Sequence, residues 1–118
     1  MRRALRALAV LAAMAACSAG PRTEAAYAAQ LPTEVRGSYE VFAQRCSKCH
    51  SLARPLDSGI DDDGYWAMYV DRMRRQPASG ISLADRPPIL AFLHYYALEQ
   101  RKRKAGDAGN APGPEETK

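Results

Sequence analysis

Three neighbouring residues carry the side chains needed to attach a metal cofactor covalently. Cys46, Cys49 and His50 form the pattern C-x-x-C-H. If this segment is helical, its two sulfur atoms lie about one turn apart on the same side. Two such thiols can form thioethers with the two vinyl groups of one porphyrin, and the imidazole that follows is a good ligand for haem iron. The spacing therefore predicts one covalent haem c, with His50 as the proximal iron ligand.

Other chemistry for the same residues fits less well. A structural zinc site needs four ligands, and outside the motif only Cys17 and His94 remain. A thioredoxin-like redox pair belongs to a βαβ context, and the sequence contains no such pattern. A disulfide between Cys46 and Cys49 is conceivable in an oxidising compartment, but a histidine directly after Cys49 favours haem attachment.

The sixth position of the iron has three candidate ligands, namely Met68, Met73 and His94, or it stays open. With Trp66 at the centre of an apolar helical face, Met73 lies almost directly below it, and Met68 points to the opposite side. His94 lies off the apolar stripe of the following helix, which favours an exposed histidine. We expect Met73 to be the distal ligand; plain core packing is the alternative for this methionine.

The elements that must position these residues are expected to be helices, because no run of alternating apolar and polar residues indicates a strand. Apolar residues with helical spacing predict helices over about 38–50, 62–74 and 86–103, the last with Asp85 as its N-cap. The apolar faces of these three helices comprise Tyr39, Phe42, Cys46 and Cys49; Trp66, Tyr69, Val70 and Met73; and Ile89, Phe92, Leu93 and Tyr96.

Both ends of the chain are expected to lie outside this helical core. Residues 1–16 combine early arginines with an Ala/Leu/Val run and predict a signal peptide, too short in its apolar part to span a bilayer. Residues 17–34 are predicted to form a flexible tether. Residues 105–118 contain no large apolar side chain and are predicted to be disordered. The folded part is then residues 35–104.

Cys17 follows the apolar run of the leader directly. The segment from Met14 to Cys17 resembles the lipobox of bacterial lipoproteins, in which the cysteine is lipidated and becomes the new N-terminus. Lipidation of Cys17 would explain an odd number of cysteines and would hold an exported protein at the membrane face. Ordinary cleavage beyond residue 17 is the alternative.

The basic balance of the whole chain is no evidence for nucleic-acid binding. Three of its 17 Lys and Arg residues, Arg2, Arg3 and Arg6, lie in the leader, which leaves 14 basic against 13 acidic residues. The mature chain is thus almost neutral, unlike nucleic-acid-binding domains. About seventy folded residues with few large apolar side chains also make a thin core, which a covalent haem would complete.

These residues together resemble the class I c-type cytochromes. The resemblance covers about residues 37–97 and rests on Phe42 and the C-x-x-C-H motif, on Trp66 and Met73, and on the segment from Gly80 to Leu93. It implies a small all-α fold of about three helices around one covalent haem, with Phe42 and Phe92 where the first and last helices cross. It also implies that Cys46 and Cys49 attach the haem and that His50 and Met73 are its axial ligands.

The function expected from this resemblance is one-electron transfer rather than catalysis, in the periplasm of a bacterium. The compact form is also similar to haem domains attached to some periplasmic dehydrogenases, so we expect redox proteins as partners. Arg45, Lys48, Arg54 and Arg74–Arg75 are candidates for a basic ring that attracts an acidic partner, or they form an ordinary solvated surface. A haem enzyme or gas sensor with an open sixth position is the alternative function.

Overall fold

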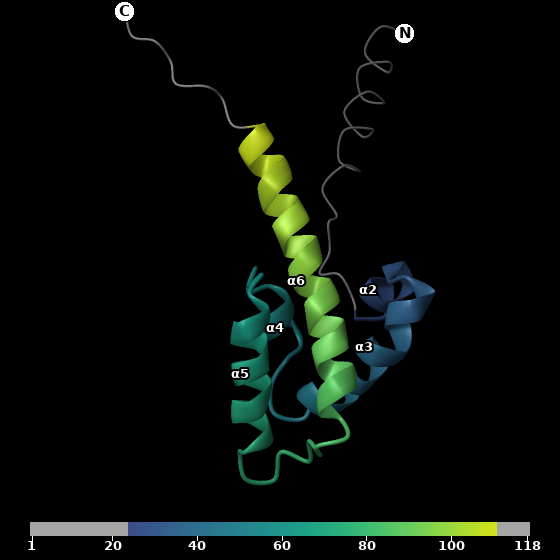
Figure 1. The fold of residues 1–118 in the computed structure, drawn as a ribbon. Helices are drawn as coiled ribbons and strands as arrows, with labels where there is room; N and C mark the ends of the chain where they lie inside the picture. Colours follow the sequence, from purple (N-terminus) through teal and green to yellow (C-terminus); the bar gives the residue numbers. More distant parts are fainter. Residues whose placement is uncertain (1–23, 111–118) are drawn as a thin grey trace, which may run out of the picture.

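The structure is a computed structural model that describes residues 24–110, and within them helices are the only regular secondary structure (Figure 1). The helices are α2 (Glu24–Gln30), α3 (Thr33–Cys46), α4 (Ala53–Leu56), α5 (Asp63–Arg74) and α6 (Arg86–Gly109). The expected small all-α fold is therefore confirmed. In the same residues, no helix is long and apolar enough to cross a membrane.

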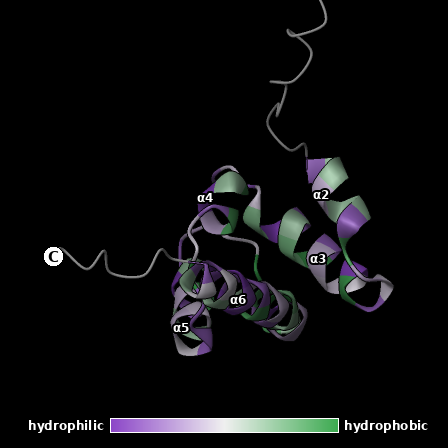
Figure 2. Cartoon of the chain, turned by 90° about the horizontal axis from the view of Figure 1, so that it is seen from above, coloured by the Kyte–Doolittle hydropathy of each residue, from purple (hydrophilic) through white to green (hydrophobic). Residues whose placement is uncertain are grey.

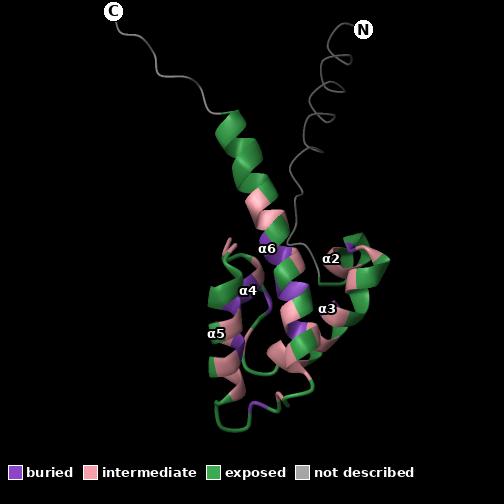
Figure 3. Ribbon diagram, in the orientation of Figure 1, coloured by how far each residue is buried: buried purple, intermediate pink, exposed green. Residues whose placement is uncertain are grey.

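The core forms where α6 packs against both α3 and α5. The rings of Phe42 on α3 and Phe92 on α6 lie 4.6 Å apart, as expected for a pair at the contact of the first and last helices of the core. All four apolar residues predicted for α6 are buried, and Figure 3 shows purple segments on the part of this helix that lies between α5 and α3. The fully buried large side chains are Trp66, Phe42, Phe92, Leu52, Ile89 and Leu93.

The first long helix differs from the expected range of 38–50 at both ends. It begins at Thr33, because Pro32 has its φ fixed near −53° and lacks the N–H that a helix leaves unpaired at its start. It ends at Cys46, where the N–H of Ser47 bonds to the carbonyl of Ala43 before the chain turns. The short helix α4 was not predicted.

The other two long helices begin as expected. The carboxylate of Asp62 accepts a hydrogen bond from the N–H of Tyr65 and caps α5. Asp85 precedes α6, but its side chain does not cap that helix. It accepts hydrogen bonds from the backbone N–H and hydroxyl of Ser82 at 2.7 and 2.8 Å instead.

The segment predicted as a tether contains structure in its second half. Helix α2 occupies residues 24–30, and Leu31 after it is only 4% exposed. The ring of Tyr27 lies 5.5 Å from that of Tyr39 and meets the ring of Phe92 edge-on at 6.4 Å. The tether prediction is therefore wrong for this part of the segment, because Tyr27 and Leu31 bury apolar surface on α3 and α6. Figure 2 shows α2 beside α3 in the view from above.

The predicted disordered tail also begins too early. Helix α6 continues to Gly109, five residues past the expected boundary at 104. Its last part stands clear of the core and is exposed on all sides, as the green end of the helix in Figure 3 shows. Ala and Lys are good helix formers and α6 is already nucleated, so the helix extends without further packing. Residues 1–16, predicted as a signal peptide, lie outside the described residues.

Candidate functional site

The C-x-x-C-H motif lies where α3 ends. Cys46 is the last residue of the helix and is partly buried, and Cys49 stands exposed in the turn that follows. The predicted helix therefore holds for Cys46 but is wrong for Cys49, because α3 ends at Cys46 and residues 47–49 form a turn. Both thiols are free. The ring Nδ1 of His50 lies 3.3 Å from the carbonyl oxygen of Ser51, close to its own backbone.

A largely apolar cavity opens beside this turn, between α3, α5 and the first turns of α6. It encloses about 630 Å³ of empty space, a figure that includes the part open to solvent. Its apolar walls are Phe42, Pro55, Trp66, Tyr69, Val70, Ile81, Ile89 and Leu93. Such walls suit the faces of a flat apolar ring system and exclude water from it.

The four residues predicted to hold the cofactor all line this one cavity. Cys46, Cys49 and His50 come from the end of α3 and the turn after it, and Met73 comes from the last turn of α5. Two thiols, an imidazole and a thioether thus face one apolar space. Gln76, three residues after Met73, lines the cavity as well.

The competing candidates lie elsewhere. Met68 has 55% of its side-chain surface exposed and does not line the cavity. His94 is also exposed, and its Nδ1 lies 3.0 Å from a carboxylate oxygen of Asp63 at the other end of α5. Cys17, the candidate lipidation site, lies outside the described residues.

Burial makes Cys46 a weak acid. Desolvation in the apolar wall, helped by the neighbouring Cys49, raises the pKa of the Cys46 thiol to about 11. The thiol is therefore protonated at neutral pH, and a protonated thiol is a poor nucleophile and a poor ligand for metal ions such as zinc. Burial also raises the pKa of Tyr69, which lines the same cavity.

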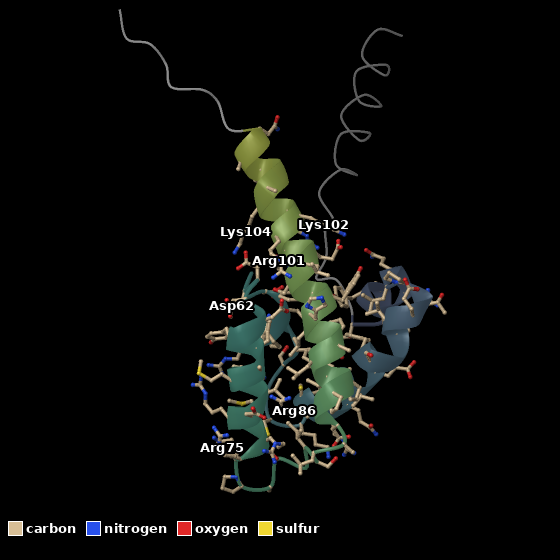
Figure 4. All side chains as sticks on the ribbon, viewed as in Figure 1. Asp62, Arg75, Arg86, Arg101, Lys102 and Lys104 are labelled. Carbon is tan, nitrogen blue, oxygen red and sulfur yellow. The ribbon has the colours of Figure 1, made fainter. Side chains whose placement is uncertain are left out.

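Two ion pairs brace the helices around the cavity. Arg45, directly before Cys46, lies 3.1 Å from the carboxylate of Asp85 at the start of α6. Arg86 donates two hydrogen bonds to the carboxylate of Asp71 on α5, at 2.8 and 3.0 Å. In Figure 4 the labelled Arg86 lies near the end of α6 that adjoins the lower part of α5.

Ion pairing removes two arginines from the predicted ring of free basic side chains. Arg45 is neutralised by Asp85, and Arg74 lies 3.8 Å from Asp71, so neither is a free cation at the rim. Sequence reasoning missed Asp71 and Arg86, and it gave Asp85 only the role of an N-cap. Arg45 and Asp85 stand far apart in the chain, as do Arg86 and Asp71, so no local pattern could have identified these two pairs.

The cavity wall contains the kinds of side chain that a covalent haem would need. Its two thiols could attach a porphyrin, and His50 and Met73 are side chains that could bind its iron. Within residues 24–110 there is no group of three or more His, Cys, Asp and Glu side chains that could hold a bare metal ion. No protein-family model, no curated protein and no solved structure matches this chain.

Proposed function

We propose that the chain is an exported c-type cytochrome that carries one covalent haem and transfers single electrons between redox proteins. The observation that supports this proposal best is the convergence of Cys46, Cys49, His50 and Met73 on one apolar cavity. A chance C-x-x-C-H sequence would have no reason to adjoin an apolar cavity that also has a methionine from a separate helix in its wall.

Each of these residues has one role. Cys46 and Cys49 would attach the porphyrin through thioethers, and His50 and Met73 would bind its iron. When bound, the haem supplies a reversible one-electron couple between ferric and ferrous iron. The apolar walls keep water from the macrocycle, which together with methionine ligation favours a higher reduction potential.

Covalent attachment is tested by denaturing electrophoresis followed by haem staining. The purified protein should give a stained band that acid-acetone extraction does not remove. Cys46→Ala and Cys49→Ala should weaken attachment, and His50→Ala should leave little folded protein. Cys17→Ala is the control, and it should not change the intensity of the haem stain per amount of protein. A stain that extraction removes from the wild-type protein would refute the proposal.

A haem enzyme or gas sensor with an open sixth position is the competing function. The presence of Met73 on the cavity wall favours a closed position, because a six-coordinate iron has no site for a substrate. Reduced protein mixed with carbon monoxide separates the two functions. An unchanged spectrum supports the electron carrier, and immediate binding supports the open site.

The proposal includes export and two further features of the N-terminal segment. We propose that residues 1–16 direct the chain to the periplasm and that Cys17 is lipidated. Only six residues separate Cys17 from the start of α2, so a fully extended connection spans at most about 25 Å. An anchor at Cys17 would then keep the haem domain near the membrane and near membrane-associated partners, such as a periplasmic dehydrogenase. Mass spectrometry of the native N-terminus tests this; an unmodified terminus beyond residue 17 would contradict it.

A further inference from the structure

Helices α5 and α6 are tied together by polar contacts at two opposite ends. At the cavity end, Nε and Nη2 of Arg86 donate to the two carboxylate oxygens of Asp71 at 2.8 and 3.0 Å. At the far end, Nδ1 of His94 lies 3.0 Å from Asp63, and Arg101 lies 3.4 Å from the same carboxylate. The two ties join the same pair of helices but differ in their distance from the candidate site.

The contact between Arg86 and Asp71 sits on the part of α5 that carries Met73. Asp71 is two residues before Met73, and Arg86 is the first residue of α6. Neither side chain lines the cavity, so neither would touch a haem there. Two parallel hydrogen bonds between a guanidinium and a carboxylate restrict orientation as well as distance. This pair therefore restricts the rotation of the last turn of α5 about the helix axis and its position along that axis relative to α6.

The other contacts of that turn are apolar packing and polar bonds within α5 or to the loop after it. Val70 is buried in the core at 3% exposure, and the hydroxyl of Ser79 bonds to the carbonyl of Arg74 just beyond Met73. Neither joins the turn to α6 in a fixed direction, because the first is a non-directional apolar contact and the second links the last residue of α5 to the loop that follows it. The side chain of Met73 itself is only partly buried. Among the polar contacts in residues 24–110, the two bonds from Arg86 to Asp71 are those that join this turn to α6.

We infer that Arg86, through its paired hydrogen bonds with Asp71, is a positioning residue that holds the sulfur of Met73 at binding distance from the haem iron. The inference rests on the proposed function. It follows from the general behaviour of metal sites, in which residues outside the ligand set orient the ligands and their loss commonly weakens metal binding by about 10-fold or more. The effect should be confined to the distal side, because the thioethers and His50 come from α3 and the turn after it.

The test uses the full-length haem protein with Arg86→Lys, which keeps the positive charge but cannot form the two parallel bonds. We expect the equilibrium between bound and released Met73 to shift about 10-fold toward release. The weak far-red sulfur-to-iron band should decrease, and the reduced protein should begin to bind carbon monoxide. Covalent haem content should be unchanged. Asp71→Asn should give the same result from the other partner.

His94→Gln is the matched control, because it disturbs the tie between the same two helices at the end away from the cavity. It should leave the far-red band and the response to carbon monoxide as in the wild type. The inference fails if Arg86→Lys keeps the wild-type band, or if both variants lose it equally, since equal loss indicates general loosening of the helix pair. A wild-type protein with covalent haem but no far-red band would contradict Met73 ligation, and one without covalent haem would contradict the proposed function itself.

Discussion

Two methionines of α5 stand five residues apart and meet opposite surroundings. Met73 lines the apolar cavity, and Met68 is 55% exposed on the outer side of the helix. A thioether can bind iron only if it faces the space where the haem lies. The helical phase therefore assigns different roles to two chemically identical side chains.

At the residue scale, this difference gives a direct prediction for the proposed cytochrome. Met73→Ala should abolish the far-red sulfur-to-iron band and lower the reduction potential, because methionine ligation raises that potential. Met68→Ala should change neither. Optical spectroscopy and a redox titration of both variants provide the measurement, and the opposite pattern would exchange the roles of the two methionines.

At the scale of the elements, periodicity predicted the helices that carry a dense apolar stripe. The stripe from Ile89 to Tyr96 identified α6, and Trp66 and Val70 identified α5 nearly to its ends, because Asp62 and Asp85 provide recognisable boundaries. A stripe shows which face is buried, but it does not show where the helix ends. The prediction of a further helical turn beyond Cys46 was therefore wrong. The prediction that Tyr39 and Phe42 lie on the buried face of this helix was correct.

The features that sequence reasoning missed depend on contacts between distant segments. Helix α2 has seven residues, too few for an isolated helix to be stable in water, and Ala-rich segments resemble linkers in composition. Its formation depends on Tyr27 and Leu31 meeting α3 and α6. The candidate ligands could be predicted because the motif and the helical phase are local. The brace between Arg86 and Asp71 could not, because it joins two helices across a loop.

The dependence of α2 on packing predicts the effect of removing its buried contact. Leu31→Ala leaves a cavity beneath α2 and should lower the free energy of unfolding by about 2 kcal/mol, at the low end for buried leucines because the segment is near one end of the fold. Leu83→Ala, at a residue with 69% exposure, should change it by less than about 0.5 kcal/mol. Urea denaturation followed by circular dichroism measures both. Equal midpoints for the two variants would show that α2 adds nothing to the stability of the core.

At the scale of the whole molecule, ion pairs join the same helices that meet in the apolar core. Asp85 links α6 to α3 through Arg45, and Asp71 links α5 to α6 through Arg86. Asp61, before α5, lies 2.9 Å from Lys104 on the exposed half of α6, where Figure 4 labels the lysine. Each contact is near the surface, so each contributes modestly alone. Together they connect all three long helices.

The charges of these carboxylates give the fold a predictable dependence on pH. Hydrogen bonds from Arg86 and from Lys104 hold the pKa values of Asp71 and Asp61 below the usual 3.8, and hydrogen bonds from Ser82 do so for Asp85. A lowered pKa in the folded state means that the stabilisation is complete above the pKa of the unfolded chain and is lost as the pH falls through the folded value. The melting temperature should therefore be level from about pH 5 to 8 and fall below about pH 4.

The acid limb of this profile should also respond to mutation and salt. Arg86→Gln removes the main cause of the lowered pKa of Asp71, so the variant should lose less stability between pH 5 and pH 2 than the wild type does. Added salt should reduce the acid effect in the wild type, because these pairs are partly exposed and screened. Thermal unfolding at fixed ionic strength across this range measures the profile. A melting temperature that stays constant down to pH 2, in wild type and variant alike, would show that the core and not the ion pairs holds the three helices together.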